Sequence, residues 1–152
     1  MQEEIFEGTL NWHGQSADTP FDYDHYNRST TLQFVGGAQL EGSAGSSFKG
    51  DDTKLNPETL MLASLMQCHF LTFMAVAAKS RVPITSYEDQ ASGKLGMKDG
   101  KMRFVEVVLH PKVTLADPAQ AEKLHRLHEK AHANCFMGNS VNFEVKVEPV
   151  LA

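Results

Sequence analysis

The chain has 152 residues, of which 41% are hydrophobic and 22% are charged, and its formal net charge is −5. This length and composition suit a single folded domain with a packed core and exclude a globally disordered chain. Lysine and arginine form no basic stripe, so nucleic acid is not an expected partner.

The N-terminal residues Met1-Gln2-Glu3-Glu4 are acidic and lack the charged and apolar regions of a signal peptide. The longest apolar stretch, residues 60–78, is interrupted by serine, glutamine, histidine and threonine, which disfavours a membrane span. We therefore expect one domain over residues 1–152, located in the cytoplasm and without a membrane partner.

In the first third of the chain the sequence predicts two strands and two connections. Residues 3–12 alternate loosely and predict a strand, and residues 28–35 predict a second one. Residues 13–27 are rich in turn formers and predict a loop. Residues 36–53 contain several glycines and predict a long, flexible connection.

The clearest local signal is the start of a helix. Asn56-Pro57-Glu58 combines an N-cap residue, a proline at the first helical position and an acid in the first turn. The helix should run to about Ser80, because Pro83 prevents its continuation. It is apolar nearly all round, which predicts that it is buried.

The second half of the chain predicts a hairpin, a helix and a last strand. Residues 86–97 and 101–115 are predicted strands joined by the turn pair Asp99-Gly100. A second helix is expected over residues 118–134, and residues 141–147 alternate as a strand. This order predicts an α+β fold with a mostly antiparallel sheet.

Cys68 lies on a narrow polar stripe of the first helix, with Ser64 one turn before it and Thr72 one turn after it. The two hydroxyls can simply bond back to main-chain carbonyls of the same helix. They can also surround the thiol with a small polar pocket, and the pattern leaves both interpretations open.

Cys135 falls on the core-facing side of the second predicted helix. Two packed helices could bring the sulfurs within disulfide reach, which needs Cα atoms about 4.4–6.8 Å apart. The alternative is two unrelated buried thiols that behave as small hydrophobic groups.

Histidines offer two further interpretations. His125, His128 and His132 follow one stripe of the second helix and could bind zinc together with Cys135, or they could form a solvated helix edge. Their spacing matches no usual zinc pattern. His69 adjoins Cys68, but neighbours in a helix point about 100° apart, which disfavours a Cys–His nucleophile.

Two segments resemble the OsmC/Ohr family of osmotically inducible and organic hydroperoxide resistance proteins. They are NPETLMLASLMQC at 56–68 and HEKAHANCFMGNSV at 128–141. The resemblance implies an OsmC-like fold with two long central helices in an intertwined homodimer. It also implies a stress-defence peroxidase that reduces organic hydroperoxides with an external dithiol and contains no metal or organic cofactor.

The resemblance also assigns roles to four residues. Cys68 matches the peroxidatic cysteine, Cys135 the resolving cysteine, Arg28 an arginine beside the reactive thiol, and Glu58 the glutamate that holds this arginine. We expect Arg28 to favour the thiolate, because a nearby guanidinium stabilises a negative charge. Glu58 and Cys68 are ten residues apart on one helix, or about 15 Å, so Glu58 is expected to reach the partner chain's site.

The chain departs from better-known members in three places. Phe136 follows the second cysteine where those members usually have proline, the 13–27 loop lacks their Gly-Gly-Arg pattern, and the 36–53 segment is longer than in compact members. Three other functions stay open beside a peroxidase. These are a non-catalytic redox sensor of the same fold, a protein that binds an apolar ligand, and a zinc protein.

Overall fold

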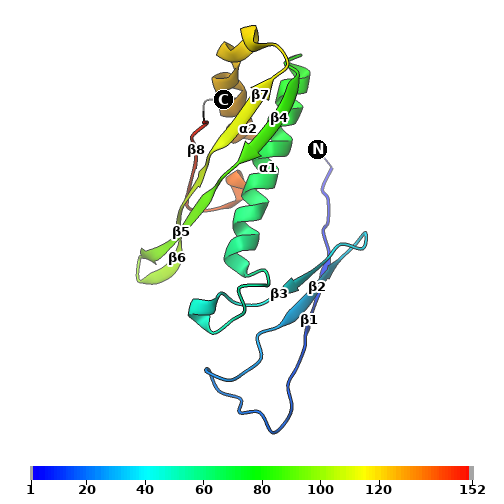
Figure 1. The fold of residues 1–152 in the computed structure, drawn as a ribbon, viewed down its shortest axis with the longest axis vertical. Helices are drawn as coiled ribbons and strands as arrows, with labels where there is room; N and C mark the ends of the chain where they lie inside the picture. The colour runs from blue at the N-terminus through cyan, green and yellow to red at the C-terminus, as the bar shows by residue number, and fades with distance from the viewer. Residues whose placement is uncertain (1, 151–152) are drawn as a thin grey trace. The chain divides into compact units, whose positions relative to one another are not determined.

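A computed structural model describes residues 2–150 of the chain, and it confirms the α+β class with mostly antiparallel sheets (Figure 1). The chain divides into two compact units, Met1–Leu60 and Met61–Ala152. The single domain expected over residues 1–152 includes Met1, Leu151 and Ala152, which lie outside the described residues, and it stays a prediction.

In chain order the elements are β1 (Gly8–Trp12), β2 (Thr30–Phe34), β3 (Gln39–Gly42), η1 (Ser46–Phe48), α1 (Pro57–Lys79), β4 (Ile84–Asp89), β5 (Ser92–Lys98), β6 (Lys101–Leu109), β7 (Pro111–Leu115), η2 (Pro118–Lys123), α2 (Leu124–Asn134), η3 (Gly138–Ser140) and β8 (Glu144–Val147).

The first unit is built on an antiparallel sheet with the strand order β1-β2-β3. Its register places Leu10 opposite Leu32, and Leu32 opposite Leu40. The strand expected over residues 3–12 is confirmed only over Gly8–Trp12, since residues 2–7 lie outside the assigned strand.

The expectation of a flexible connection over residues 36–53 was wrong. Gly36 and Gly37 adopt positive φ angles of 96° and 92°, which lets the chain reverse directly into β3. Beyond β3, the Ser46 N–H donates to the Asp52 carboxylate over 2.7 Å. A Cβ atom on Gly50 would lie 1.8 Å from the carbonyl oxygen of Ala44, so this segment packs closely on itself.

The first unit encloses no hydrophobic core of its own in the single chain. Among residues 2–60 no hydrophobic side chain is fully buried. Exposed large hydrophobic side chains occur before, within and after its strands: Ile5, Phe6, Leu10, Trp12, Phe21, Tyr23, Phe34, Val35, Phe48 and Leu55. Apolar surface of this extent is typical of an interaction site.

Helix α1 begins as the sequence predicts. The Asn56 side chain accepts a hydrogen bond of 2.8 Å from the Thr59 N–H, so it caps the helix. The expected burial on all sides was wrong for the single chain, because only one stripe is buried: Leu65, His69, Phe73 and Ala77. By length and composition alone α1 could cross a membrane, and in the structure its buried stripe packs into the second unit.

The two long strands predicted in the second unit are each divided between two sheets. Strand β4 pairs with β7, whereas β5 pairs with β6, and β8 joins β6 in parallel. The β5-β6 pairing and the β4-β7 pairing are separated at His110, which lies between β6 and β7. Its N–H donates to the Asp89 carboxylate over 2.8 Å instead of pairing with a strand. The predicted hairpin turn is confirmed, since Asp99 and Gly100 both have positive φ.

The second predicted helix lies where the sequence places it, but only its later part is an α-helix. Asp117 caps it by accepting from the Ala119 N–H, and its first six residues, Pro118–Lys123, form a 3-10 helix. The α-helix proper, α2, has 11 residues, so only α1 is a long helix. The last strand is shorter than predicted, because Val141 and Phe143 pack against the core outside the sheet.

The second unit holds two hydrophobic clusters, one against the C-terminal half of α1 and one against its N-terminal half. Strands β4 and β7 run beside the helix (Figure 1), where the ring of Tyr87 packs against Phe70 and Phe73. The first cluster contains Phe73, Ala77, Val82, Val113, Leu127 and Ala131, and the second contains Leu65, Val107 and Leu109. Leu127 and Ala131 belong to α2, so this packing holds α2 against α1.

A buried pair of histidines connects the two helices. His69 Nε2 and His128 Nδ1 lie 3.1 Å apart, and the two rings meet edge to edge with 7° between their planes. Only 1% of His69 and 4% of His128 is exposed, so the interpretation of the stripe as a solvated helix edge is wrong for His128. Burial lowers the pKa of both imidazoles to about 4, assisted at His69 by His128 and His132, and at His128 by His125.

This pair predicts a loss of stability in mild acid. The pKa of a histidine in the unfolded chain is near 6.5. The unfolded chain therefore binds more protons than the folded one between about pH 4 and 6.5. The free energy of unfolding should therefore fall with decreasing pH in this window, by at most roughly 1.4 kcal/mol per pH unit for each histidine. Denaturant unfolding at several pH values measures it.

The control is the double variant His69→Phe with His128→Phe, which keeps an aromatic ring at each position and removes both titrating groups. Its stability should change less than that of the native protein between pH 6.5 and 4. Equal slopes for the two proteins would show that the histidine pair does not cause the effect.

Candidate functional site

The structure brings the two cysteines together. Cys68 lies in the middle of α1 and is half-buried, and Cys135 directly follows α2 and is 3% exposed. Both thiols are free, and the Cys135 thiol donates a hydrogen bond to the Cys68 sulfur. Two thiols that hydrogen-bond to one another are candidates for a disulfide.

Backbone N–H groups after α2 also point at the two sulfurs. The Met137 N–H donates to Cys68 Sγ over 3.5 Å, and the Gly138 N–H donates to Cys135 Sγ over 3.3 Å. The Phe136 N–H is a further donor to Cys68. The turn that aims these groups is closed by a 2.9 Å hydrogen bond from the Asn139 N–H to the Cys135 carbonyl.

These contacts separate the acidities of the two thiols. Burial raises the pKa of Cys68, but nearby hydrogen-bond donors, of which the Met137 N–H contributes most, outweigh it, and the pKa lies below that of an ordinary thiol. Burial, together with the hydrogen bond donated to Cys68, raises the pKa of Cys135 to about 11. Cys68 is therefore the thiol that ionises first, and Cys135 keeps its proton.

Both interpretations of the polar stripe hold in the structure. Thr72 Oγ1 donates to the Cys68 carbonyl over 2.8 Å, and Ser64 Oγ donates to the Met61 carbonyl over 2.7 Å. The same two side chains also border the cavity beside Cys68. The hydroxyls are thus satisfied within the helix and still form part of the polar wall around the thiol.

A cavity of about 740 Å³ opens beside Cys68 within the second unit. Its wall is mixed, with aliphatic and aromatic side chains facing a few polar ones: Ser64, Gln67, Leu71, Thr72, Ala75, Val76, Lys79, Asn134, Phe136 and Met137. The volume lies within the range of about 300–1,000 Å³ that small-molecule sites usually have. A molecule in this cavity would lie against the half-exposed sulfur.

Arg28 lies in the first unit, where main-chain carbonyls hold its guanidinium. It donates to the Tyr26 carbonyl over 3.0 Å and to the Tyr23 carbonyl over 2.5 Å. The guanidinium carbon also lies 3.8 Å from the centre of the Tyr26 ring, in a cation–π contact. Arg28 lines a separate cavity of about 380 Å³ together with Trp12 and Phe21.

Glu58 occupies the first turn of α1, as predicted, where its charge favours the helix dipole. Among residues 2–150 it forms no ion pair or hydrogen bond with Arg28, whose orientation is fixed by the two tyrosine carbonyls instead. The groups that lower the pKa of Cys68 are neutral donors within the second unit. The roles expected for Arg28 and Glu58 stay predictions.

Within residues 2–150 the histidines form no metal cluster with the cysteines. His128 is bonded to His69, and His125 lies 3.2 Å from the Glu129 carboxylate on the exposed side of α2. His69 does not contact the neighbouring Cys68 as a base, because its Nε2 faces His128. The chemistry that the site offers is therefore that of the two thiols.

The donors on residues 136–138 were missed by the sequence analysis. Every residue except proline carries a main-chain N–H, so no residue type marks these positions as donors. The one available signal was Phe136 itself, because the proline usual at this place could not donate a hydrogen bond.

Comparisons with known proteins agree on one family. Residues 50–150 match the family described as OsmC-like protein. A solved OsmC-like protein of unknown function from Vibrio cholerae is 31% identical, with a TM-score of 0.90 over 97% of this chain and 100% of that one. No curated protein matches the chain in sequence.

Two more distant structures share the fold. An organic hydroperoxide resistance protein from Elizabethkingia anophelis is 19% identical, with a TM-score of 0.73 over 99% of this chain and 97% of that one. One from Bacillus subtilis is 18% identical, with a TM-score of 0.66 over 98% of both chains.

Replacing Phe136 by proline should make Cys68 less acidic. The preceding residue, Cys135, has φ −71° and ψ 112°, a conformation compatible with a following proline, and the change removes the N–H of residue 136. Losing a hydrogen bond worth about 0.5–1 kcal/mol should slow alkylation of Cys68 by iodoacetamide at neutral pH about two- to fivefold.

The matched control is Phe136→Leu, which keeps the N–H and shortens only the side chain. It should be alkylated at close to the native rate. For each protein the rate is measured as a function of pH, which reports the pKa of Cys68. If the proline variant reacts as fast as the leucine variant, the Phe136 N–H does not lower the pKa of Cys68.

Proposed function

Since the chain belongs to the OsmC-like protein family, we propose that it is a thiol peroxidase that reduces organic hydroperoxides. Cys68 is the attacking thiolate and Cys135 is the resolving thiol. The observation that supports this most directly is the contact between an acidified sulfur and a thiol that keeps its proton.

The first step uses the acidity of Cys68. Thiolates, not thiols, attack peroxides, and the hydrogen-bond donors around Cys68, led by the Met137 N–H, favour its thiolate. The sulfur attacks the terminal oxygen of the hydroperoxide, the O–O bond breaks, and the alkoxide leaves and takes up a proton to become an alcohol. Cys68 is oxidised by two electrons to a sulfenic acid.

The second step uses the contact with Cys135. While Cys68 is a thiolate, the hydrogen bond that Cys135 donates to it keeps the Cys135 proton in place. Once Cys68 is a neutral sulfenic acid this effect disappears, so the pKa of Cys135 falls. Its sulfur then attacks the Cys68 sulfur, water leaves, and a disulfide forms. An external dithiol returns two electrons by exchange and regenerates both thiols.

The cavity beside Cys68 suits an organic rather than an inorganic peroxide. Leu71, Val76 and Phe136 supply an apolar wall for an alkyl or aryl group, and Ser64 and Thr72 supply polar groups near the sulfur. Burial of the organic group adds binding free energy that hydrogen peroxide cannot obtain. No metal or organic cofactor takes part in the proposed cycle.

We further propose an intertwined homodimer in the cytoplasm. The exposed hydrophobic side chains of the first unit and the uncovered faces of α1 provide the apolar surface that a second copy would bury. In this assembly Arg28 and Glu58 of one chain act at Cys68 of the other, where the guanidinium binds the peroxide oxygens and stabilises the leaving alkoxide. A redox sensor would form the same disulfide without rapid turnover.

The first test is turnover of cumene hydroperoxide with a dithiol donor. The native protein should turn over, Cys68→Ser should lose activity by at least a thousandfold, and Cys135→Ser should complete one oxidation and then stop. Mass spectrometry of Cys68 in the Cys135→Ser variant should find the sulfenic acid. Negligible native turnover with several dithiols, together with disulfide formation, would favour the redox sensor.

The second test is complementation between two inactive variants, Cys68→Ser and Glu58→Gln. If Glu58 acts on the partner chain's cysteine, a mixed dimer contains one site with both native residues. Refolding an equal mixture should restore about a quarter of the native activity, since half of the dimers are mixed and each has one complete site. The control mixes Cys68→Ser with the double variant Cys68→Ser and Glu58→Gln, which has no intact cysteine. Activity no higher than that of Glu58→Gln alone would place Glu58 within its own chain's site.

A further inference from the structure

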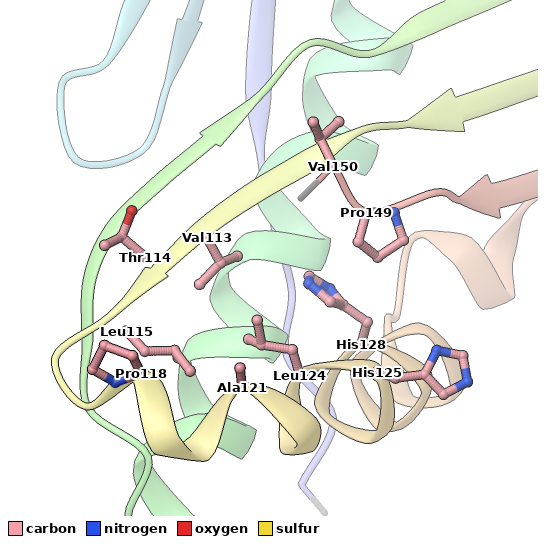
Figure 2. Close-up of a pocket in the computed structure, with 10 residues that line it drawn as sticks. All are labelled: Val113, Thr114, Leu115, Pro118, Ala121, Leu124, His125, His128, Pro149 and Val150. Carbon is pink, nitrogen blue, oxygen red and sulfur yellow. The ribbon is translucent and has the colours of Figure 1, made fainter. Parts of the chain in front are cut away.

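The second unit contains another cavity, of about 670 Å³, that shares no lining residue with the cavity at Cys68. Figure 2 shows side chains of β7 on one side and side chains of η2 and α2 on the other. We call it the His128 pocket. It is lined by Val113, Thr114, Leu115, Pro118, Ala121, Leu124, His125, His128, Pro149 and Val150.

The wall of the His128 pocket is mostly apolar, and its one deeply buried polar side chain is His128. This imidazole is 4% exposed, and its Nδ1 is occupied by the hydrogen bond with His69. Among residues 2–150 the other ring nitrogen, Nε2, forms no hydrogen bond, and it is not among the fully buried polar atoms without a partner, so it is not sealed from solvent. An apolar cavity with one well-placed polar group is the usual form of a small-molecule site.

The tautomer of the histidine pair follows from the surroundings of His69. Its Nδ1 is buried without a partner, and a buried N–H without an acceptor is rarer than a buried acceptor without a donor. The proton of His69 therefore resides on Nε2 and is donated to His128 Nδ1. His128 then carries its own proton on Nε2, as the only donor that the deep part of the pocket offers.

The wall of the His128 pocket offers no cation to pair with a charged ligand, which restricts the charge that a ligand can carry. None of the ten lining residues is a lysine or an arginine, and His125 already lies beside the Glu129 carboxylate. Burial keeps His128 neutral at ordinary pH. A carboxylate would lose its hydration here without gaining a cation, whereas a neutral oxygen would gain the His128 N–H.

We propose that the His128 pocket binds a neutral, mainly apolar small molecule through one acceptor oxygen, such as that of a ketone, ester or alcohol. The apolar part fills the space between β7 and α2, and the oxygen accepts from His128 Nε2. Such binding does not use Cys68 and does not depend on the proposed peroxidase activity.

The experiment uses 2-nonanone as the probe and nonanoate as the charged comparison. Each is titrated into the full-length, 15N-labelled protein while backbone and imidazole resonances are recorded. The variant Ala121→Trp fills the pocket from an exposed position of η2, and Ala119→Trp adds the same side chain to η2 outside the pocket. Cys68→Ser controls for binding at the other cavity.

We expect saturable binding of 2-nonanone to the native protein, to Cys68→Ser and to Ala119→Trp, with a shift of the His128 Nε2 resonance. Binding to Ala121→Trp should be at least tenfold weaker, and so should binding of nonanoate to the native protein. The proposal is overturned if native binding does not saturate, if Ala121→Trp binds like Ala119→Trp, or if nonanoate binds more tightly than the ketone. Shifts confined to residues around Cys68 would also overturn it.

Discussion

A thiolate at the surface of an apolar helix needs hydrogen-bond donors, and the site around Cys68 is arranged to supply them. Burial alone would keep the thiol protonated. The end of α2 offsets this with a thiol and two main-chain N–H groups, from residues 135–137. The donors are effective only because Leu127, His128 and Ala131 pack α2 against α1 at a fixed position.

Neutral donors and a cation can both favour a thiolate, and the two are separate parts of the proposed site. Thiolates are often stabilised by a nearby arginine, and that is the expectation for Arg28. Donors of the second unit already lower the pKa of Cys68, while the guanidinium of Arg28 is held by tyrosine carbonyls of the first unit. In the proposed mechanism the cation also binds the peroxide oxygens and stabilises the leaving alkoxide.

The histidine pair shows how one polar contact can serve two parts of the molecule. On one side, His69 fixes the helix that carries Cys68, because its Nε2 reaches α2. On the other side, His128 lines a cavity that the thiols do not share. The pair is buried and neutral, so its protonation in acid would weaken the contact that aligns the two cysteine-bearing helices.

Local signals in the sequence determined the features that depend on neighbouring residues. Asn56-Pro57 specifies the start of α1 and Asp99-Gly100 the hairpin, because a cap and a tight turn involve only a few adjacent residues. The two cysteine motifs likewise identified the family and the fold. The tertiary structure decided what depends on distant residues: the burial of His128 against a residue 59 positions away, the division of each predicted strand between two sheets, and the N–H groups aimed at Cys68. Main-chain donors are the same in nearly every residue, so only the packing of α2 on α1 determines which of them reach the sulfur.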